Sequence, residues 1–267
     1  MKNIVLTGAS TGIGFATATY LAQKGYHIFA GARKQEDIDR LEKIENITSI
    51  KLDVTKDQDI SNLTTFLRDN KHSVYGLVNN AGISEPGPLV EINEALFRNV
   101  FEVNVFGAFR MTQAVFPFIK VNNGRIINIA SFLGKVTVPF NGPYCMSKHE
   151  LESFSDALRR ELNHLNIKVS CVEPGVIKTP IWKKSGPINE HTYSAEFKSQ
   201  YENLPKILLY TKKSLLPEDV AKVVFDALES DNPKPRYLIT EDETYYNELL
   251  ASEDLKTDQF MRNILNS

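Results

Sequence analysis

The amino-acid sequence predicts an α/β fold, in which a doubly wound, seven-stranded, mostly parallel sheet carries helices on both faces. Two observations predict it. Short apolar runs alternate along the chain with longer segments whose apolar residues recur at helical spacing. In addition, the first apolar run leads directly into a glycine-rich turn and a helical pattern. Because parallel strands are joined by crossovers, which are usually helices, this alternation favours a parallel sheet.

The length and composition fit one globular domain. The chain has 267 residues, 42% of them hydrophobic and 24% charged, and it can bury a sizeable core. It contains no linker, repeat or low-complexity block, so we expect residues 1–267 to form a single domain. The apolar run after Met1 is too short for a signal peptide, and no segment approaches the roughly 20 apolar residues that span a bilayer. A cytoplasmic protein is therefore expected.

Charge and cysteine usage exclude several classes of partner and site. The net charge of −2 gives no electrostatic reason to expect nucleic acid or an anionic membrane as a partner. Cys145 and Cys171 are far apart and lack the spacing of metal ligands, which suits a reducing compartment. The five histidines are scattered, so no catalytic metal is expected.

The elements can be placed in order from their apolar spacing and their terminating residues. Gly25 is expected to stop the first helix, Thr55 to cap the helix after the third strand, and Pro217 to start a late helix. Residues 176–216, with three prolines, are expected to form a lid of short helices, and the tail to Ser267 a helix or two. The expected strands are 4–6, 27–31, 49–54, 74–78, 125–131, 168–172 and 237–239. The expected helices run from the glycine turn to about 24, through 60–67, and over 94–119, 144–165 and 217–228.

The first strand is followed by Thr7-Gly8-Ala9-Ser10-Thr11-Gly12-Ile13-Gly14. Gly8, Gly12 and Gly14 let the backbone turn tightly and approach a pyrophosphate, and the helix that follows offers it free N–H groups. Glycines also serve ordinary turns. In this strand–turn–helix context we favour a nucleotide site.

The second strand ends in basic residues. An acid at this place would bond the ribose 2′-hydroxyl of NAD, whereas an arginine suits the 2′-phosphate of NADP. No acid stands at 31–34, but Arg33 and Lys34 do. These residues predict NADP(H) rather than NAD(H), and the alternative is a solvated basic turn.

Polar residues follow the other strands at the edge where ligands of open α/β sheets collect. Asp53 ends the third strand, Asn79-Asn80-Ala81-Gly82 follows the fourth, and Ser131 ends the fifth. The asparagines and glycine could simply form a turn. Asn104 lies inside the expected helix 94–119. Because an asparagine is mildly unfavourable inside a helix, we expect it to have a particular role there.

Tyr144 and Lys148 stand four residues apart at the front of a helical pattern, and therefore share one helix face. A nearby ammonium lowers the pKa of a phenol, so the pair could be a tuned proton donor and acceptor. On its own, the pair is equally an ordinary helix start with a half-buried tyrosine and a solvated lysine.

Together these motifs resemble the classical short-chain dehydrogenase/reductase (SDR) family. The resemblance covers residues 3 to about 180 and rests on six motifs in the expected order: Thr7-Gly8-x-x-x-Gly12-x-Gly14, Asn79-Asn80-Ala81-Gly82, Asn104, Ser131, Tyr144-x-x-x-Lys148 and Pro174-Gly175-x-x-x-Thr179. It implies a Rossmann-type fold and one dinucleotide-binding catalytic domain. It also implies hydride transfer between NADP(H) and a carbonyl or secondary alcohol.

The resemblance also implies roles for single residues. Tyr144 would be the general acid/base, and Ser131 would hold the substrate oxygen. Lys148 would lower the pKa of Tyr144 and bind the nicotinamide ribose, while Asn104 would bend its helix and hold a water for proton relay. The expected cofactor-binding residues are Gly8, Ser10, Thr11, Gly12, Ile13, Gly14, Arg33, Lys34, Asp53, Val54, Asn80, Ala81, Gly82, Tyr144, Lys148, Pro174, Gly175, Val176 and Thr179.

Within the family, residues 144–148, 154–162 and 173–175 resemble the branch of retinol, 17β-hydroxysteroid and 3-hydroxybutyrate dehydrogenases. The chain lacks the N-terminal anchor of the membrane-bound members, which argues against a retinoid role. Loops 83–90, 132–143 and 176–216 should wall the substrate, with Leu133, Val136, Val138, Phe140, Ile181 and Trp182 as apolar candidates. These residues predict a hydrophobic substrate, or they simply pack the lid.

Two other functions stay open. One is a 3-oxoacyl-carrier-protein reductase, for which Lys183 and Lys184 are possible contacts. The other is a non-catalytic NADP-binding regulator, which would be expected to lose part of the set Asn104, Ser131, Tyr144 and Lys148. The helices expected at 94–119 and 144–165 predict a homodimer or homotetramer, as in related proteins.

Overall fold

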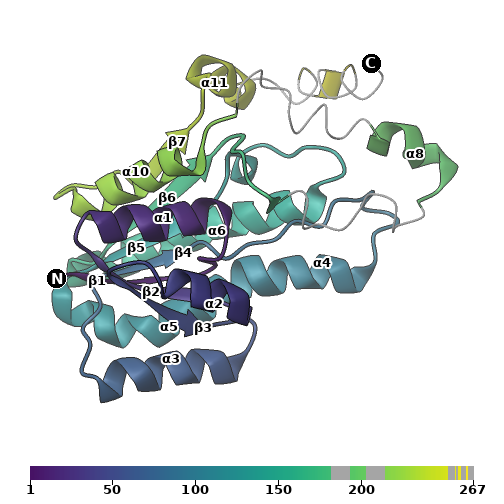
Figure 1. Ribbon diagram of the computed structural model, residues 1–267. Helices are drawn as coiled ribbons and strands as arrows, with labels where there is room; N and C mark the ends of the chain where they lie inside the picture. Colours follow the sequence, from purple (N-terminus) through teal and green to yellow (C-terminus); the bar gives the residue numbers. More distant parts are fainter. Residues whose placement is uncertain (182–192, 203–213, 252–255, 257, 260–262, 264–267) are drawn as a thin grey trace.

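Seven parallel strands form one sheet in the computed structural model, which describes residues 1–181, 193–202, 214–251, 256, 258–259 and 263 (Figure 1). The predicted fold class is therefore confirmed, with every described pairing parallel. The strand order is β3-β2-β1-β4-β5-β6-β7. The strands are β1 (Asn3–Leu6), β2 (His27–Ala32), β3 (Ile47–Lys51), β4 (Gly76–Asn79), β5 (Arg125–Ile129), β6 (Lys168–Pro174) and β7 (Arg236–Ile239).

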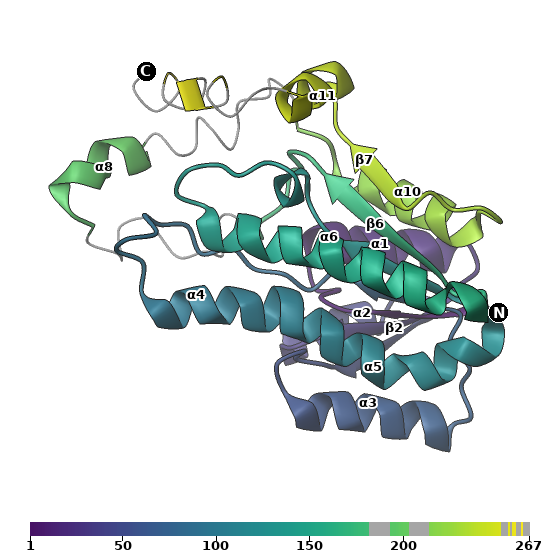
Figure 2. The ribbon, with the colours of Figure 1, turned by 180° about the vertical axis from the view of Figure 1, so that it is seen from behind.

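Helices cover both faces of the sheet (Figures 1 and 2). On one face lie α1 (Gly12–Gln23), α2 (Gln35–Leu41) and α10 (Pro217–Glu229), and α1 packs directly on α10. The other face carries α3 (Asp57–Asp69), α5 (Gly107–Ile119) and α6 (Gly142–Leu162). α4 (Glu94–Phe101) leads into α5, and α8 (Ala195–Glu202) and α11 (Glu243–Ala251) lie beyond the sheet. Short 3₁₀ turns are η2 (Lys120–Asn122), η3 (Phe132–Gly134) and η4 (Asn163–Leu165).

The core follows from the alternation of side chains along each strand. In β1, Ile4 and Leu6 face α1 and α10, whereas Val5 faces α3 and α5. Side chains of successive strand residues point to opposite faces, and both faces here are covered. This explains why the strands are almost continuously apolar rather than alternating with polar residues.

The strand order creates the place for a site. From β1 the chain winds outward to β2 and β3, and then crosses back to β4 on the other side of β1. Loops from the carboxyl ends of β1 and β4 therefore diverge, and ligands of open α/β sheets bind in the crevice that this leaves.

Several element boundaries differ from the predictions by a few residues, and two of them lie next to Asp53. β3 covers 47–51 rather than 49–54, and α3 begins at Asp57 with Lys56 before it, so Thr55 does not cap this helix. The Oδ1 atom of Asp53 instead accepts bonds from the backbone N–H of Thr55 at 3.0 Å and from its hydroxyl at 2.8 Å. This Asx turn ends the strand early and occupies the hydroxyl that would have capped the helix.

The long helix expected at 94–119 is interrupted. A π-helical segment, η1 (Glu102–Phe106), joins α4 to α5 and contains Asn104. In the described part of the lid, α8 is a short helix as expected, whereas Trp182, Lys183 and Lys184 lie outside the described residues. No helix in the described part of the chain is both long enough and apolar enough to cross a bilayer.

Candidate active site

A pocket lies at the carboxyl edge of the sheet and gathers residues from six of its strands or from the segments that follow them. Most of the predicted site residues line it: Gly8, Ser10, Thr11, Gly12, Ile13, Arg33, Asp53, Val54, Asn80, Ala81, Gly82, Ser131, Tyr144, Lys148, Pro174, Gly175, Val176 and Thr179. Gly14, Lys34 and Asn104 do not belong to its lining. The topology thus brings together segments that are far apart in the sequence, from Gly8 to Leu249.

The glycine turn is held against the end of β4. Gly8 and Gly12 have positive φ angles of +67° and +55°, which L side chains rarely adopt. A Cβ atom on Gly8 would lie 2.8 Å from the Cα of Ala81, and one on Gly14 would lie 2.2 Å from the carbonyl oxygen of Gly8. Gly14 does not line the pocket, but it lets α1 pack this close to the turn, because a side chain at this position would collide with Gly8.

Thr7 and Asn80 fasten this contact. The Thr7 hydroxyl accepts bonds from the backbone N–H groups of Asn80 and Ala81, both at 3.0 Å. In return, the Asn80 side-chain amide donates to the carbonyl oxygens of Thr7 and Gly8, both at 3.0 Å. Asn80 therefore fixes the shape of the turn.

The first turn of α1 fits an anionic ligand such as a pyrophosphate. Thr11 stands at the N-cap position, no side chain caps the helix, and its first turn carries no acidic residue. The first N–H groups of a helix have no partner within the helix, and they favour an anion. A Cβ atom on Gly12 would lie 3.2 Å from Thr179. The absence of a side chain therefore leaves space between the start of α1 and Thr179.

Arg33 and Lys34 are placed differently. Arg33 lines the pocket with a side chain that is 63% exposed, and its Nη1 atom lies 4.0 Å from Oδ2 of Asp53. Lys34 instead pairs with Glu36 at 3.4 Å, where both side chains are about three-quarters exposed. Of the two predicted cations, only Arg33 is positioned to meet a ligand in the pocket.

Tyr144 is buried in the pocket wall, with its side chain hydrogen-bonded to Ser131. Burial raises the pKa of Tyr144 to about 12, and the bond to Ser131 opposes this rise. The lowering of the Tyr144 pKa that we expected from Lys148 is not observed, because burial sets the direction of the shift and Ser131 is the group that opposes it. At neutral pH the phenol is protonated and can donate its proton.

Lys148 is also buried, and its Nζ atom donates to the carbonyl oxygen of Ile129 at 2.7 Å. The same atom lies 5.5 Å from the ring centre of Tyr144, as expected for residues four apart on a helix. Burial lowers the pKa of Lys148 to about 8. The ammonium form therefore still dominates at pH 7, close to the phenol.

Asn104 lies under the pocket in the π-helical segment. Its Oδ1 atom accepts from the N–H of Ile83, and its Nδ2 atom donates to the carbonyl of Ile83 and to the hydroxyl of Ser147, each at 2.9 Å. Its side chain thus joins three segments around Lys148. The expected departure from a regular helix coincides with this residue.

The structure adds pocket residues that no motif had pointed to. Tyr246 and Leu249 of α11 line the pocket, and the ring of Tyr246 stacks edge-on against Phe132 at 4.1 Å between centres. Leu133, Val138 and Ile181 line it as expected, whereas Val136 and Phe140 pack beside it. Further lining residues are Gly31, Ala32, Leu52, Ile83, Ser84, Glu85, Val103, Ile129, Ala130, Phe132, Ile177 and Pro180. The helical spacing of apolar residues in α11 could indicate that this helix has a buried face, but not which residues that face contacts.

We predict that Lys148→Met changes the pH dependence of folding. The folded protein holds the Lys148 pKa near 8 against an ordinary 10.5, so the unfolded chain binds more protons between these values. Wild-type stability should therefore rise relative to the variant by about 2 kcal/mol from pH 7 to pH 10. Urea unfolding of both proteins at the two pH values measures this, with exposed Lys24→Met as the control that shows no such change. A difference in unfolding free energy between wild type and Lys148→Met that does not change with pH would contradict the lowered pKa of Lys148.

Comparison with known proteins agrees with this geometry. The family model described as short chain dehydrogenase matches residues 2–189. The 3-amino-tetrahydro-pyrrolizinone reductase of Xenorhabdus hominickii is 36% identical over 254 residues, covering 90% of this chain and 87% of that protein. A solved short-chain dehydrogenase from Streptomyces avermitilis is 25% identical with a TM-score of 0.82, and the match covers 98% of both chains. A solved 4-hydroxyisoleucine dehydrogenase complexed with NADH is 26% identical with a TM-score of 0.71, covering 90% of this chain and 96% of that chain.

The predicted branch is also represented among the relatives. They include proteins named D-beta-hydroxybutyrate dehydrogenase and retinol dehydrogenase 16 from Mus musculus and 17-beta-hydroxysteroid dehydrogenase type 6 from Homo sapiens. The resemblance inferred from the six motifs is therefore confirmed. The chain belongs to the short-chain dehydrogenase/reductase family of oxidoreductases.

Proposed function

We propose that this protein is an NADP(H)-dependent enzyme that interconverts a carbonyl group and a secondary alcohol on a hydrophobic substrate. The observation that carries the proposal is the arrangement of three side chains on the wall of one pocket. Tyr144 is hydrogen-bonded to Ser131, and Lys148 lies 5.5 Å from the centre of the same ring, in the pocket that Gly8 and Gly12 also line. When bound, a nicotinamide dinucleotide supplies or accepts the hydride.

Each side chain of the pocket has a chemical task in this proposal. Tyr144, protonated at neutral pH, donates its proton to the substrate oxygen as negative charge develops there. Ser131 donates a hydrogen bond to the same oxygen and holds it in line with the phenol. Lys148 stabilises the phenolate that remains, because an ammonium and a phenolate attract strongly in a site without water. Proton return from solvent completes the cycle, for which Asn104 is our candidate for the water-holding residue.

The dinucleotide would extend from Arg33 to Thr179. Arg33 and Asp53 would meet the adenosine end, the turn of Gly8 and Gly12 the pyrophosphate, and Thr179 and Val176 the carboxamide. Arg33 supports NADP(H), since its guanidinium can bind a phosphate in a bidentate manner. The 4-hydroxyisoleucine dehydrogenase complexed with NADH supports the nicotinamide class but not this preference. NAD(H) is the alternative.

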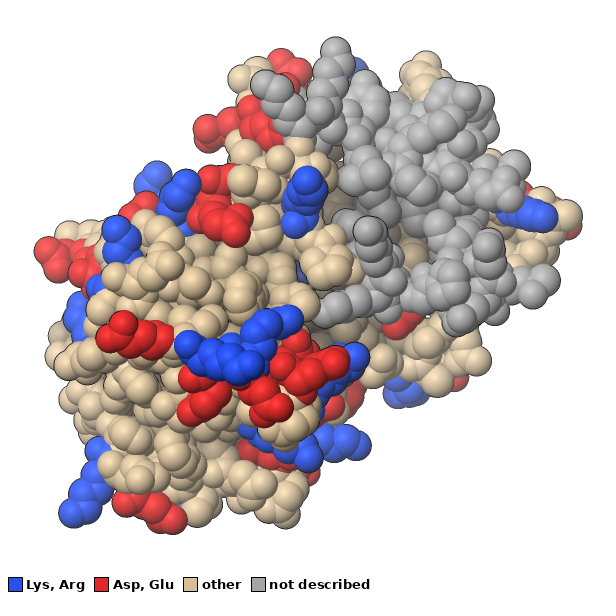
Figure 3. Space-filling view, in the orientation of Figure 1, with Lys and Arg blue, Asp and Glu red and all other residues tan. Residues whose placement is uncertain are grey.

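Carbonyl reduction of a small hydrophobic molecule is favoured over the other two functions. Leu133, Val138 and Ile181 give the substrate end an apolar wall, and the Xenorhabdus hominickii relative is itself named a reductase. A carrier-protein reductase calls for a basic surface, and over the described part of the face seen in Figure 3 basic and acidic side chains are intermixed. Ser131, Tyr144 and Lys148 all line the pocket with Asn104 behind them, which argues against a regulator without catalytic activity.

Tyr144→Phe tests the proton donor. The variant keeps the ring but has no proton to give, so we expect turnover in NADPH-dependent carbonyl reduction to fall by about a thousandfold. NADPH oxidation over aliphatic, aromatic, steroid and 3-oxoacyl carbonyls measures it and also identifies the substrate class. Tyr75→Phe is the matched control, since that hydroxyl bonds the carbonyl of Leu228 away from the pocket. Turnover of Tyr144→Phe equal to that of wild type would contradict the assignment of Tyr144 as the proton donor.

Arg33→Ala tests the choice of dinucleotide. Loss of the guanidinium should lower the ratio of kcat/KM for NADPH to that for NADH by about tenfold. The side chain is mostly exposed, so the wild-type preference should also weaken at high salt. Lys24→Ala, on the outer end of α1, controls for loss of a surface charge. An unchanged ratio in Arg33→Ala would show that Arg33 does not select the cofactor.

A homodimer or homotetramer is the assembly that we propose. Phe106, Phe109 and Met146 are 50%, 43% and 44% exposed on neighbouring helical segments, and Phe109 contacts Phe154 of α6 edge-on. An exposed apolar face of this kind is typical of a protein interface. A second copy of the chain would cover it symmetrically.

Phe109→Glu should therefore convert the oligomer to monomers, because the interface would bury an unpaired charge. Size-exclusion chromatography with light scattering measures the mass. Val121→Glu changes another exposed apolar residue, 69% accessible in η2, and should leave the assembly intact. A wild-type protein that is monomeric at micromolar concentration would contradict the proposed assembly.

A further inference from the structure

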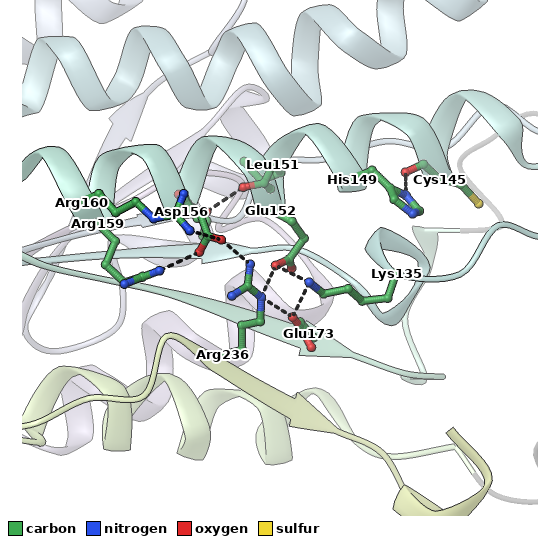
Figure 4. A network of polar contacts seen from close by, with 12 residues as sticks. Lys135, Cys145, His149, Leu151, Glu152, Asp156, Arg159, Arg160, Glu173 and Arg236 are labelled. Carbon is green, nitrogen blue, oxygen red and sulfur yellow. Dashed lines mark hydrogen bonds and ion pairs between the residues drawn. The ribbon is translucent and has the colours of Figure 1, made fainter. Parts of the chain in front are cut away.

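A cluster of charged side chains lies between α6 and the strands β6 and β7 (Figure 4). Glu152 of α6 and Glu173 of β6 have side chains that are only 5% and 8% exposed. Arg236 of β7 reaches both carboxylates, with its Nε atom 2.8 Å from Glu152 and 3.4 Å from Glu173. Lys135, just after η3, lies 3.5 Å and 4.0 Å from the same two groups, and Asp156 also pairs with Arg236, at 3.1 Å.

Three members of this cluster sit on segments that carry candidate active-site residues. Glu173 directly precedes Pro174 and Gly175, which line the pocket. Glu152 lies one helical turn after Lys148 on α6. Lys135 follows η3, which begins next to Ser131. The cluster thus links the three segments that carry Ser131, Lys148 and Pro174.

These segments are also packed closely against each other. A Cβ atom on Gly134 would lie 2.9 Å from the carbonyl oxygen of Lys148 and 3.1 Å from Cγ of Glu152. The Ser131 hydroxyl lies 3.5 Å from the carbonyl oxygen of Pro174. A shift of either carboxylate therefore has to move the backbone that positions Ser131, Lys148 or Pro174.

Two neighbouring carboxylates in a buried site repel each other unless cations offset their charge. Burial and the neighbouring Glu152 both raise the pKa of Glu173, while Lys135 and Arg236 act in the opposite direction. Arg236 contacts both glutamates and Asp156 and lies on the edge strand. It is therefore the member whose loss would leave most charge unpaired.

We propose that Arg236 is a positioning residue of the active site, which acts through Glu152 and Glu173 to hold α6, η3 and the end of β6 in register. This inference rests on the proposed function, since it assigns Arg236 to the same site. Without Arg236, repulsion between the carboxylates displaces Pro174 and Gly175 from the cofactor end and Lys148 from Ser131. A displacement of about 1 Å in such a site costs up to a hundredfold in rate.

The test compares Arg236→Met with the same substitution at a second arginine, Arg125. Arg125 is 9% exposed and donates to the carbonyl of Ser230 at 3.1 Å, at the opposite end of the strands from the pocket. Both variants should melt at lower temperature. Only Arg236→Met should weaken NADPH binding in a fluorescence titration, and lower kcat for carbonyl reduction, by about tenfold each. Arg125→Met should stay within about twofold of wild type in both.

A double variant separates positioning from general destabilisation. Adding Glu173→Gln to Arg236→Met removes the excess negative charge without restoring the arginine, so NADPH binding and kcat should recover at least about threefold. No recovery, or an Arg236→Met protein that matches Arg125→Met in both quantities, overturns the proposal. If Arg236→Met fails to fold, Arg236→Gln, which also lacks the positive charge, is compared in the same way, alone and with Glu173→Gln.

The two proposals can fail separately in this experiment. If wild type binds NADPH but reduces none of the carbonyls tested, the proposed function is wrong, and the binding titrations of the variants still decide the role of Arg236. If wild type binds neither NADPH nor NADH, both proposals are overturned.

Discussion

The close approach of two backbone segments at the ends of β1 and β4 is the constraint on which the pocket depends. The turn at Gly8 touches Ala81 so closely that a side-chain carbon would not fit between them. Four hydrogen bonds between Thr7, Gly8, Asn80 and Ala81 hold this contact. Because the turn is fixed, α1 starts at a defined point with its N–H groups directed at the crevice. The side chains opposite can then be placed relative to one bound molecule.

The chemistry of the opposite wall follows from exclusion of water. Burial favours the neutral form of both Tyr144 and Lys148, raising one pKa to about 12 and lowering the other to about 8. A phenolate alone would be unfavourable there, and so would an ammonium alone. Formed together they attract across a medium of low dielectric constant. The site thus resists ionisation of Tyr144 at rest. In the proposed reaction, Lys148 would stabilise the phenolate that remains when the phenol gives up its proton.

The sequence was informative wherever function demands a particular residue at a particular strand end. Gly8, Asn80 and Ser131 could be placed because each follows an apolar run whose carboxyl end must lie at one edge of the sheet. Tyr144 could be placed because it stands at the front of a helical pattern, four residues before Lys148. The early end of β3 could not be predicted, since it depends on Asp53 binding Thr55.

Contacts between segments that are distant in the sequence were equally inaccessible. Tyr246 comes to the pocket only because α11 folds back over Phe132. The ion pairs of Arg236 with Glu152 and Glu173 join positions 63 or more residues apart, and charged residues on three separate elements carry no signal that they will meet. Lys34 shows the converse, because a residue next to Arg33 in the sequence turns to Glu36 and away from the pocket.

The π-helical segment at 102–106 has a consequence for comparing this chain with other sequences. It holds one residue more per turn than an α-helix would, and one residue rotates the following side chains by about 100°. An insertion or deletion between relatives is therefore best placed inside this helix, at Glu102–Phe106, rather than in the neighbouring loops, where alignment gaps are usually assumed.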